Sequence, residues 1–398
     1  MFPLNRPFPF AVYALSVLAG SSWATEPTLP GVGAAMEEMI AKNEVAGAVT
    51  AVLAADKVLG FESTGFADVA SKRAMSPDTL FWIASMTKPI TGVALMMLQD
   101  EGKLEVRDLV SKYLPEFGDL KTPFGNPANL TIRQLMTHTS GLGEASGAAA
   151  KDARTLSDLV PLWLSAPMQY EPGSKWKYTQ SGINAAARIV EVVSGQSFDA
   201  FLQTRLFTPL GMVDTTFYPN ENQRARLATG YAKNKESGAL EAVPPRFDLE
   251  NKDRPPLGNG GLYSTPHDYA RFCQMLLGEG SFAGRRYLSK GAMKFLNTPQ
   301  TGELPCGFFQ SEAAGNLGAN YGWGIGTCIL KKPHDGVAAM LSPGTFGHGG
   351  AWGTQAWIDP VKGVAYLLMV QRSNFANGDG SEVRRAFQET AAKALNKQ

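Results

Sequence analysis

One short stretch of the chain carries a serine and a lysine three residues apart. The segment 81–89 reads FWIASMTKP, and apolar residues follow at positions 90, 93, 94, 97 and 98, which is the spacing of an amphipathic helix. Pro89 has no amide proton and is tolerated in the first turn of a helix. This places Ser85 at the helix N-terminus and Lys88 on the same helical face.

This pair has a specific chemical use. A serine hydroxyl becomes a good nucleophile when a neighbouring base takes its proton. Lys88 can be that base if burial or another cation favours its neutral form. Amide groups at the helix N-terminus can also stabilise a developing oxyanion. Because such a pair also arises by chance on protein surfaces, it needs support from the rest of the chain.

Two further patterns could supply a site. Tyr178 lies in YTQSG, directly before a helical stretch, and the segment 347–353 reads GHGGAWG at the entry to a β-rich run. Glycines in a strand allow a ligand to approach the backbone closely. The sequence holds no Gly-x-Ser-x-Gly and no His-Glu-x-x-His pattern, which disfavours an α/β-hydrolase elbow and a zinc hydrolase.

Several longer motifs accompany the serine and lysine. They are LTIRQLMTHTSGL at 130–142, PLGM at 209–212, GGLYST at 260–265 and YGWG at 321–324. Together, over roughly residues 35–395, they resemble the class C branch of the serine β-lactamase and penicillin-recognising superfamily. That branch includes class C β-lactamases, D-alanyl-D-alanine carboxypeptidases, D-aminopeptidases and family VIII carboxylesterases.

The resemblance implies a role for each catalytic residue. Ser85 would be the acylated nucleophile and Lys88 its proton partner. Tyr178 would pass the proton to the leaving group and activate the deacylating water, and the amides of Ser85 and Ala351 would form the oxyanion hole. The phenol of Tyr178 becomes a usable base only if Lys88 holds its phenolate, so the first proton acceptor is left open. The resemblance implies no cofactor and no metal.

The substrate-binding positions depart from the family pattern. The second motif ends in Gln180 where asparagine is usual, and the third has His348 and Gly349 in place of lysine and threonine, followed by Gly350. A histidine is mostly neutral at pH 7, so a substrate carboxylate loses a fixed cation and a hydroxyl donor. Such a third motif is closer to the esterase and D-peptidase branches than to true β-lactamases.

The element pattern predicts a mixed α/β fold with a central antiparallel sheet. Its strands come from both chain ends and helices flank it. The expected strands are 46–54, 58–66, 353–358 and 364–371, the last helix is 382–395, and the middle helices are 131–137, 155–164, 183–194 and 198–207. The α/β part then covers about 25–110 and 260–398, and a mainly helical part covers about 111–259, with 219–258 rich in loops.

The N-terminus has the layout of a signal peptide. Arg6 precedes an apolar stretch at 10–20, and Ser22 and Ala24 are the small residues of a cleavage site, so we expect residues 1–24 to be removed. Eleven apolar residues are too few to span a bilayer. The sequence therefore predicts a periplasmic or secreted protein, residues 25–398, without a membrane span.

The amino-acid composition and net charge limit the classes of molecule that this chain is expected to bind. The chain of 398 residues is 44% hydrophobic, and its 37 basic and 36 acidic residues give a net charge of +1. This balance fits a globular protein and disfavours nucleic-acid binding. Its partner should be a small ester, amide or peptide substrate; the oligomeric state is not specified.

Other singled-out residues have mostly structural interpretations. We expect Cys273 and His138 to be core or capping groups, and Tyr263, Trp323 and Trp352 to be pocket walls or core. His267 and His334 are expected on the surface. Pairing of Cys306 with Cys328 is left open because three cysteines make no disulfide framework.

These observations predict an exported serine hydrolase that forms an acyl-enzyme at Ser85 and hydrolyses small carboxylic esters. Two alternatives stay open. One is a D-alanyl-D-alanine carboxypeptidase, D-aminopeptidase or weak class C β-lactamase. The other is a non-catalytic protein that binds peptidoglycan fragments.

Overall fold

The computed structural model describes residues 26–145, 148–307, 317–376 and 378–397. The predicted signal peptide lies outside these residues. Within them, no helix is both long enough and apolar enough to cross a membrane.

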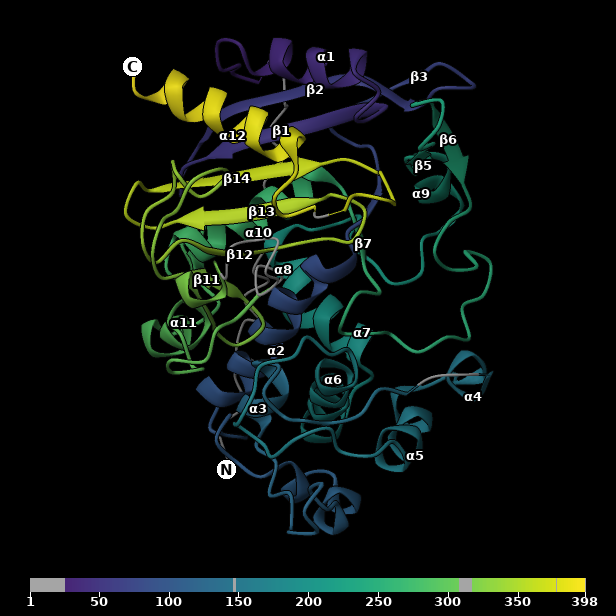
Figure 1. Cartoon of the computed structure of the whole chain (residues 1–398), viewed down its shortest axis with the longest axis vertical. Helices are drawn as coiled ribbons and strands as arrows, with labels where there is room; N and C mark the ends of the chain where they lie inside the picture. The colour runs from purple at the N-terminus through teal and green to yellow at the C-terminus, as the bar shows by residue number, and fades with distance from the viewer. Residues whose placement is uncertain (1–25, 146–147, 308–316, 377, 398) are drawn as a thin grey trace, which may run out of the picture.

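An eight-stranded antiparallel sheet forms the upper part of the molecule in Figure 1. In spatial order its strands are β10 (Tyr321–Trp323), β11 (Cys328–Leu330), β12 (Phe346–Gly349), β13 (Gln355–Asp359), β14 (Val364–Met369), β1 (Gly47–Leu53), β2 (Val58–Asp68) and β3 (Arg73–Ala74). Because β1 pairs with β14, both ends of the chain share one sheet. The predicted mixed α/β class and central sheet are therefore confirmed.

Twelve α-helices and three two-stranded pairs accompany the large sheet in the described part, together with short 3₁₀ and π-helical turns. The helices are α1 (Val32–Ala41), α2 (Thr87–Asp100), α3 (Ile132–Met136), α4 (Ala148–Asp152), α5 (Leu156–Ser165), α6 (Ser181–Ser194), α7 (Phe198–Leu202), α8 (Thr208–Leu210), α9 (Glu221–Ala225), α10 (Pro266–Leu277), α11 (Lys290–Asn297) and α12 (Glu382–Leu395). The pairs are β4 (Phe81–Trp82) with β7 (Tyr263–Ser264), β5 (Gly230–Lys233) with β6 (Leu240–Val243), and β8 (Ser281–Phe282) with β9 (Arg285–Arg286).

Both faces of the sheet are covered. Along β1, Ala48 and Val52 belong to the apolar cluster formed with α1 and α12, whereas Val49 and Leu53 belong to the cluster that includes α2 and α10. Alternate residues of a strand point to opposite faces, so every residue of β1 is buried. Figure 1 shows α1 and α12 together on one side of the sheet and α10 behind it.

Of the middle helices, α6 packs against α2 below the sheet, and α3, α5 and α7 pack against α6 (Figure 1). Their ends follow local signals in the sequence. Thr131 and Thr155 cap α3 and α5 through capping boxes. Gly195 ends α6 in the left-handed conformation, with φ 71°. The predicted helix at 198–207 divides into α7 and a π-helical turn, Gln203–Phe207.

One expectation needs correction, and one alternative that the sequence left open is decided. The surface position expected for His267 is wrong, because this residue is buried and its ring nitrogens lie 3.3 Å from Glu26 Oε1 and Asp78 Oδ1. The pairing left open for Cys306 and Cys328 is not formed, since both are buried free thiols, as is Cys273. The loop-rich segment 219–258 also holds α9 and the β5 and β6 pair.

Candidate active site

Ser85 lies in a tight helical turn between β4 and α2. The turn is a 3₁₀ helix, Ala84–Met86, and α2 begins at the next residue. Ala84 has φ 46°, in the left-handed region that costs a residue with a Cβ about 1 kcal/mol or more. Such strain is kept where the surrounding structure fixes it and is common beside functional groups. It turns the chain so that the serine enters the helix at its amino end.

Lys88 lies one turn along, fully buried under the serine. Its Nζ atom donates to Ser85 Oγ at 3.0 Å and to the backbone oxygen of Asn259 at 2.6 Å. Burial lowers the pKa of Lys88 well below its ordinary value, and the negative charge of Glu144 opposes this only in part. A neutral amine with a lone pair beside a serine hydroxyl is suited to take its proton.

Tyr178 approaches the same oxygen from the loop before α6. Its hydroxyl donates to Ser85 Oγ at 2.9 Å and lies 3.4 Å from His348 Nε2. Burial raises the pKa of Tyr178 above its ordinary value, although the hydrogen bond to Ser85 opposes the shift. Tyr178 is therefore a neutral phenol in the free protein. The three residues predicted to be catalytic meet at one oxygen atom.

An aromatic wall holds Tyr178 in place. The ring centroid of His138 lies 4.4 Å from that of Tyr178, and Trp176 and Trp323 pack on both rings. His138 Nδ1 accepts a hydrogen bond from the amide of Thr179 at 3.2 Å. His138 thus orients the tyrosine loop from the core, which agrees with the structural role expected for it.

The other side of the pocket is the end of β12. His348, Gly349, Gly350 and Ala351 line a cavity of about 300 Å³ together with Ser85 and Tyr178. His348 Nδ1 donates to the Gly349 oxygen at 2.6 Å, which leaves Nε2 as the acceptor facing Tyr178. Burial and the nearby Lys88 lower the pKa of His348 to about 3. Its imidazole is therefore uncharged at neutral pH.

Gln180 also lines this cavity, and a residue that the sequence motifs did not single out holds it there. Asn259 Nδ2 donates to Gln180 Oε1 at 2.7 Å. The side-chain carbonyl of Gln180 is thus occupied by Asn259. Asn259 directly precedes the recognised GGLYST motif, which was the available signal.

Glu144 is a second residue that sequence reasoning missed. One carboxylate oxygen accepts from the amide of Gln180 at 2.5 Å, and the other accepts from the amide and hydroxyl of Ser181 at 3.0 and 2.7 Å. A carboxylate at this position satisfies amide groups at the start of α6 and stabilises the helix dipole. It therefore fixes the loop that carries Tyr178.

Asp379 is the third residue missed. It comes from the loop between β14 and α12 and lines the cavity beside Gly349 and Gly350. Gln355 Nε2 donates to its Oδ1 at 3.1 Å. No motif in the sequence marks this loop, and only the fold brings it to the serine.

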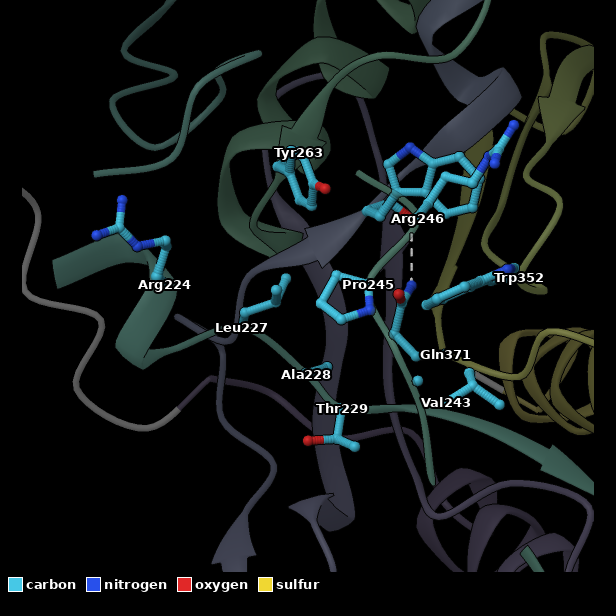
Figure 2. Close-up of a pocket in the computed structure, with 12 residues that line it drawn as sticks. Arg224, Leu227, Ala228, Thr229, Val243, Pro245, Arg246, Tyr263, Trp352 and Gln371 are labelled. Carbon is cyan, nitrogen blue, oxygen red and sulfur yellow. Dashed lines mark hydrogen bonds between the residues drawn. The ribbon is translucent and has the colours of Figure 1, made fainter. Parts of the chain in front are cut away.

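Tyr263 and Trp352 do not face the nucleophile. They line a separate cavity of about 170 Å³, where Figure 2 shows them with Arg246 and Gln371. The ring of Trp352 packs edge to face on Trp82 at 5.1 Å. These two residues are walls of this second cavity, whereas Trp323 belongs to the aromatic wall behind Tyr178.

The residues around Ser85 were compared with the side chains that commonly bind metal ions. Within the described residues, no group of three or more histidine, cysteine, aspartate or glutamate side chains is placed to hold a metal ion. The groups around Ser85 are a lysine, a phenol, an imidazole, an amide and backbone donors. This set can support proton transfer and acyl transfer.

Comparisons with known proteins show relatives that are similar in sequence and in fold over most of the chain. Protein Rv1367c of Mycobacterium tuberculosis is 31% identical over 376 residues, covering 86% of this chain and 90% of that protein. Esterase EstB of Burkholderia gladioli is 28% identical over 369 residues, covering 84% of this chain and 88% of that one. In fold, the chain is similar to EstCE1, a hydrolase with promiscuous acyltransferase activity, with a TM-score of 0.76, 22% identity, and coverage of 91% and 97%.

The family model described as Beta-lactamase matches residues 32–390, so nearly the whole described fold is accounted for. The relatives include an esterase, and the family acts on ester, amide or peptide bonds through a serine. This chain belongs to the Beta-lactamase family and is a serine hydrolase of that fold.

Proposed function

We propose that this protein is an exported esterase that forms an acyl-enzyme at Ser85 and hydrolyses small carboxylic esters. The observation that carries the proposal is the meeting of Lys88 Nζ and Tyr178 Oη at Ser85 Oγ, at 3.0 and 2.9 Å. A serine hydroxyl flanked by a neutral amine and a neutral phenol has one proton acceptor and one proton donor within reach.

Acylation follows from the protonation states. Lys88 is neutral because of its burial, and Tyr178 keeps its proton because its pKa is raised. Lys88 therefore takes the Ser85 proton as Oγ attacks the ester carbonyl, and Tyr178 donates its own proton to the leaving alkoxide. The phenolate is reprotonated from Lys88, which restores both groups.

The oxyanion is held by backbone donors. Ser85 stands in the first turn of the helical segment, where amide groups have no acceptor within the helix, and Ala351 follows two glycines at the end of β12. Their two amides supply the hydrogen bonds that a tetrahedral intermediate needs. In deacylation the same Lys88 and Tyr178 activate the attacking water.

An ester is favoured over a β-lactam or a peptide with a free C-terminal carboxylate. His348 stands where the family pattern has a lysine, and its pKa of about 3 leaves it uncharged. The pocket beside Ser85 thus offers no fixed side-chain cation from this position to a substrate carboxylate. The 28% identity to an esterase supports the same order.

The test compares the mature protein, from Thr25, with its Ser85→Ala variant on p-nitrophenyl butyrate. We expect turnover by the former and loss of about a thousandfold or more in the variant. Nitrocefin and a D-alanyl-D-alanine peptide serve as rival substrates, and faster turnover of either would replace the ester proposal. If Ser85→Ala leaves every measurable function unchanged, the protein is a binding protein.

Export is tested separately. The N-terminal residue of the mature protein, purified from periplasm or culture medium, should be Thr25. Recovery of intact Met1 from the cytoplasmic fraction would contradict this part of the proposal.

A further inference from the structure

A larger cavity, of about 720 Å³, adjoins the pocket that contains Ser85. Gln180 lines both spaces, and Asn259, which bonds to the Gln180 side chain at 2.7 Å, lines the larger one. The apolar residues on its wall include Leu159, Trp163 and Leu257. A substrate whose reacting bond lies at Ser85 can therefore extend past Gln180 into this space.

One wall of the larger cavity carries the guanidinium group of Arg254. Two aromatic rings hold this group, since its carbon lies 4.5 Å from the ring centroid of Phe247 and 5.1 Å from that of Tyr218. Nη2 also donates to the main-chain oxygen of Phe217. The side chain of Arg254 is thus held in place by rings and by backbone.

In the part of the chain that the structure describes, Arg254 forms no ion pair, and its Nε and Nη1 atoms are buried without a hydrogen-bond acceptor. Burial lowers the pKa of Arg254, and the groups that oppose this effect are the phenols of Tyr263 and Tyr218. A guanidinium nevertheless stays protonated in proteins. Arg254 is therefore a largely buried cation without an ion-pair partner, whereas buried charges are normally paired.

The acids that line the same cavity bind other groups. Glu144 accepts hydrogen bonds from the amides of Gln180 and Ser181 at the start of α6. Asp248 accepts from the amide of Glu250 at 3.0 Å. Neither carboxylate is paired with Arg254, so the guanidinium remains available to an anion that enters the cavity.

A second hollow borders Arg254 on its other side, and its charges balance. Its ionisable residues are three acids and three bases, namely Glu191, Asp199, Asp253, Arg154, Lys252 and Arg254 itself. Glu191 pairs with Arg188 at 2.9 Å. In the described structure none of these three acids forms an ion pair with Arg254, so this hollow does not supply the missing partner.

We propose that Arg254 binds an anionic group of the substrate, such as a carboxylate, in the larger cavity beyond Gln180. This inference rests on the proposed esterase function and specifies its substrate class, which is esters whose anion is separated from the ester bond by an apolar segment. Because His348 is uncharged, the cation for such an anion lies away from the reacting bond. Arg254 is a specificity residue in this proposal and takes no part in bond making.

The test uses two series of esters in which the distance from the ester bond to a carboxylate increases. In the first series the acyl group carries the acid, in p-nitrophenyl esters of adipate, suberate and sebacate. In the second the alcohol carries it, in butyrate esters of ω-hydroxy acids of matching length. Each ester is compared with its methyl-capped neutral partner. The readout is the ratio of kcat/KM for the anionic ester to that for the neutral one.

We expect this ratio to rise with chain length in one of the two series, once the carboxylate reaches Arg254. Arg254→Met should lower the ratio for the longest ester about tenfold or more, as loss of a hydrogen bond between charged groups predicts. Arg254→Lys keeps the charge and should keep part of the preference. Arg385→Met, exposed on α12, is the matched control and should leave both series unchanged.

Ratios that Arg254→Met leaves unchanged at every length, in both series, would overturn the proposal. Such a result is also expected if an inorganic anion from solution is the partner of Arg254. Arg254→Gln is a second neutral variant if the first is poorly folded.

Failure of the proposed function gives a different pattern. If the neutral esters are not hydrolysed at any length, the esterase proposal fails, and the anion site is then measured by binding. Suberate should raise the Tm of the Ser85→Ala variant more than dimethyl suberate does. Adding Arg254→Met to that variant should abolish the difference, and equal Tm values before this change would contradict the anion site.

Discussion

Lys88 donates a hydrogen bond to the main-chain oxygen of Asn259, a residue 171 positions further along the chain. This contact holds Nζ beside Ser85 Oγ by means of a backbone group, which no side-chain substitution can remove directly. The position of the base therefore depends on the course of the loop before β7. The same loop presents the Asn259 side chain to Gln180, so it supports two walls of the pocket.

Lys88→Met should abolish hydrolysis and yet stabilise the fold. We expect kcat/KM to fall roughly a thousandfold, because the serine loses its base. The folded state holds Lys88 neutral, whereas the unfolded chain binds its proton below pH 10.5. Stability of the wild type therefore rises with pH in this window. At pH 7 the free energy of unfolding of Lys88→Met should therefore exceed that of the wild type. This difference should shrink as the pH approaches 10.5.

Urea unfolding at pH 7, 8.5 and 10 measures that excess, and Lys57→Met in an exposed turn is the control. The control should keep wild-type activity. An excess that grows with pH would contradict a lowered pKa for Lys88.

The two buried histidines should make the protein sensitive to acid. Burial lowers the pKa of His348 to about 3 and shifts that of His138 in the same direction. Below pH 6.5 these two histidines bind protons in the unfolded chain but not in the folded state. The free energy of unfolding therefore falls as the pH drops. Each histidine contributes a slope of about 1.4 kcal/mol per pH unit.

His348→Gln should remove one such slope between pH 6 and 4. Guanidinium unfolding at pH 6, 5 and 4 measures the difference from the wild type. A variant whose unfolding free energy falls as steeply as that of the wild type would show that His348 accepts a proton in the folded state.

Glu144→Gln should shift the acid limb of the kcat/KM profile to lower pH. The negative charge of Glu144 raises the pKa of Lys88 against the effect of burial. Removing it lowers that pKa further, so the amine stays neutral in more acidic solution. Glu37→Gln, exposed on α1, is the charge-matched control. If the acid limb of the kcat/KM profile moves to higher pH, or does not move, Lys88 is not the titrating base.

Gly350→Ala should impair catalysis with the nucleophile and base intact. A Cβ atom at Gly350 would lie 2.1 Å from Thr354 Oγ1 and 2.6 Å from the Ile83 oxygen. The strand end must then move, and the Ala351 amide moves with it. We expect kcat to fall roughly a hundredfold, as for loss of one oxyanion donor.

The matched control for this change is Gly291→Ala in α11, where the added Cβ meets nothing closer than 3.5 Å. It should keep full activity. Wild-type kcat in Gly350→Ala would show that the Ala351 amide does not hold the oxyanion.

The three cysteines should behave as buried free thiols. Burial raises the pKa of Cys273 and Cys328 well above the usual range and that of Cys306 to about 11. A thiol-specific reagent should therefore titrate three groups per chain after unfolding and almost none before. Reductant should leave the Tm unchanged, and a lower Tm under reduction would point to a disulfide.

Local signals in the sequence predicted the elements well. The strand pair around residues 46–66 and the helix at 382–395 depend on alternation and helical spacing, and the structure has them within a few residues. Gly195 marked the end of α6 by its freedom to adopt a positive φ. The 3₁₀ turn at Ser85 was not foreseen, because it depends on the strained backbone of Ala84.

The meeting of Ser85, Lys88 and Tyr178 could be predicted because all three lie in recognisable motifs. Asn259, Glu144 and Asp379 could not, since each reaches the site through folding of a loop. Glu144 matters through the two amides it accepts from, and Asp379 through the glycine beside it. His267 was misplaced because its burial depends on Glu26, which is 241 residues away.

The pairing of β1 with β14 sets the order in which activity can appear. Ser85 is followed along the chain by more than two hundred residues before His348 and the last strand, and β1 has no partner on that side until β14 is available. Contacts of such sequence separation form late and slowly. A ribosome must therefore release nearly the entire polypeptide before Ser85 meets the Ala351 amide, its proposed second oxyanion donor. Fragments that lack the last fifty residues should remain without hydrolytic activity, whatever compartment they reach.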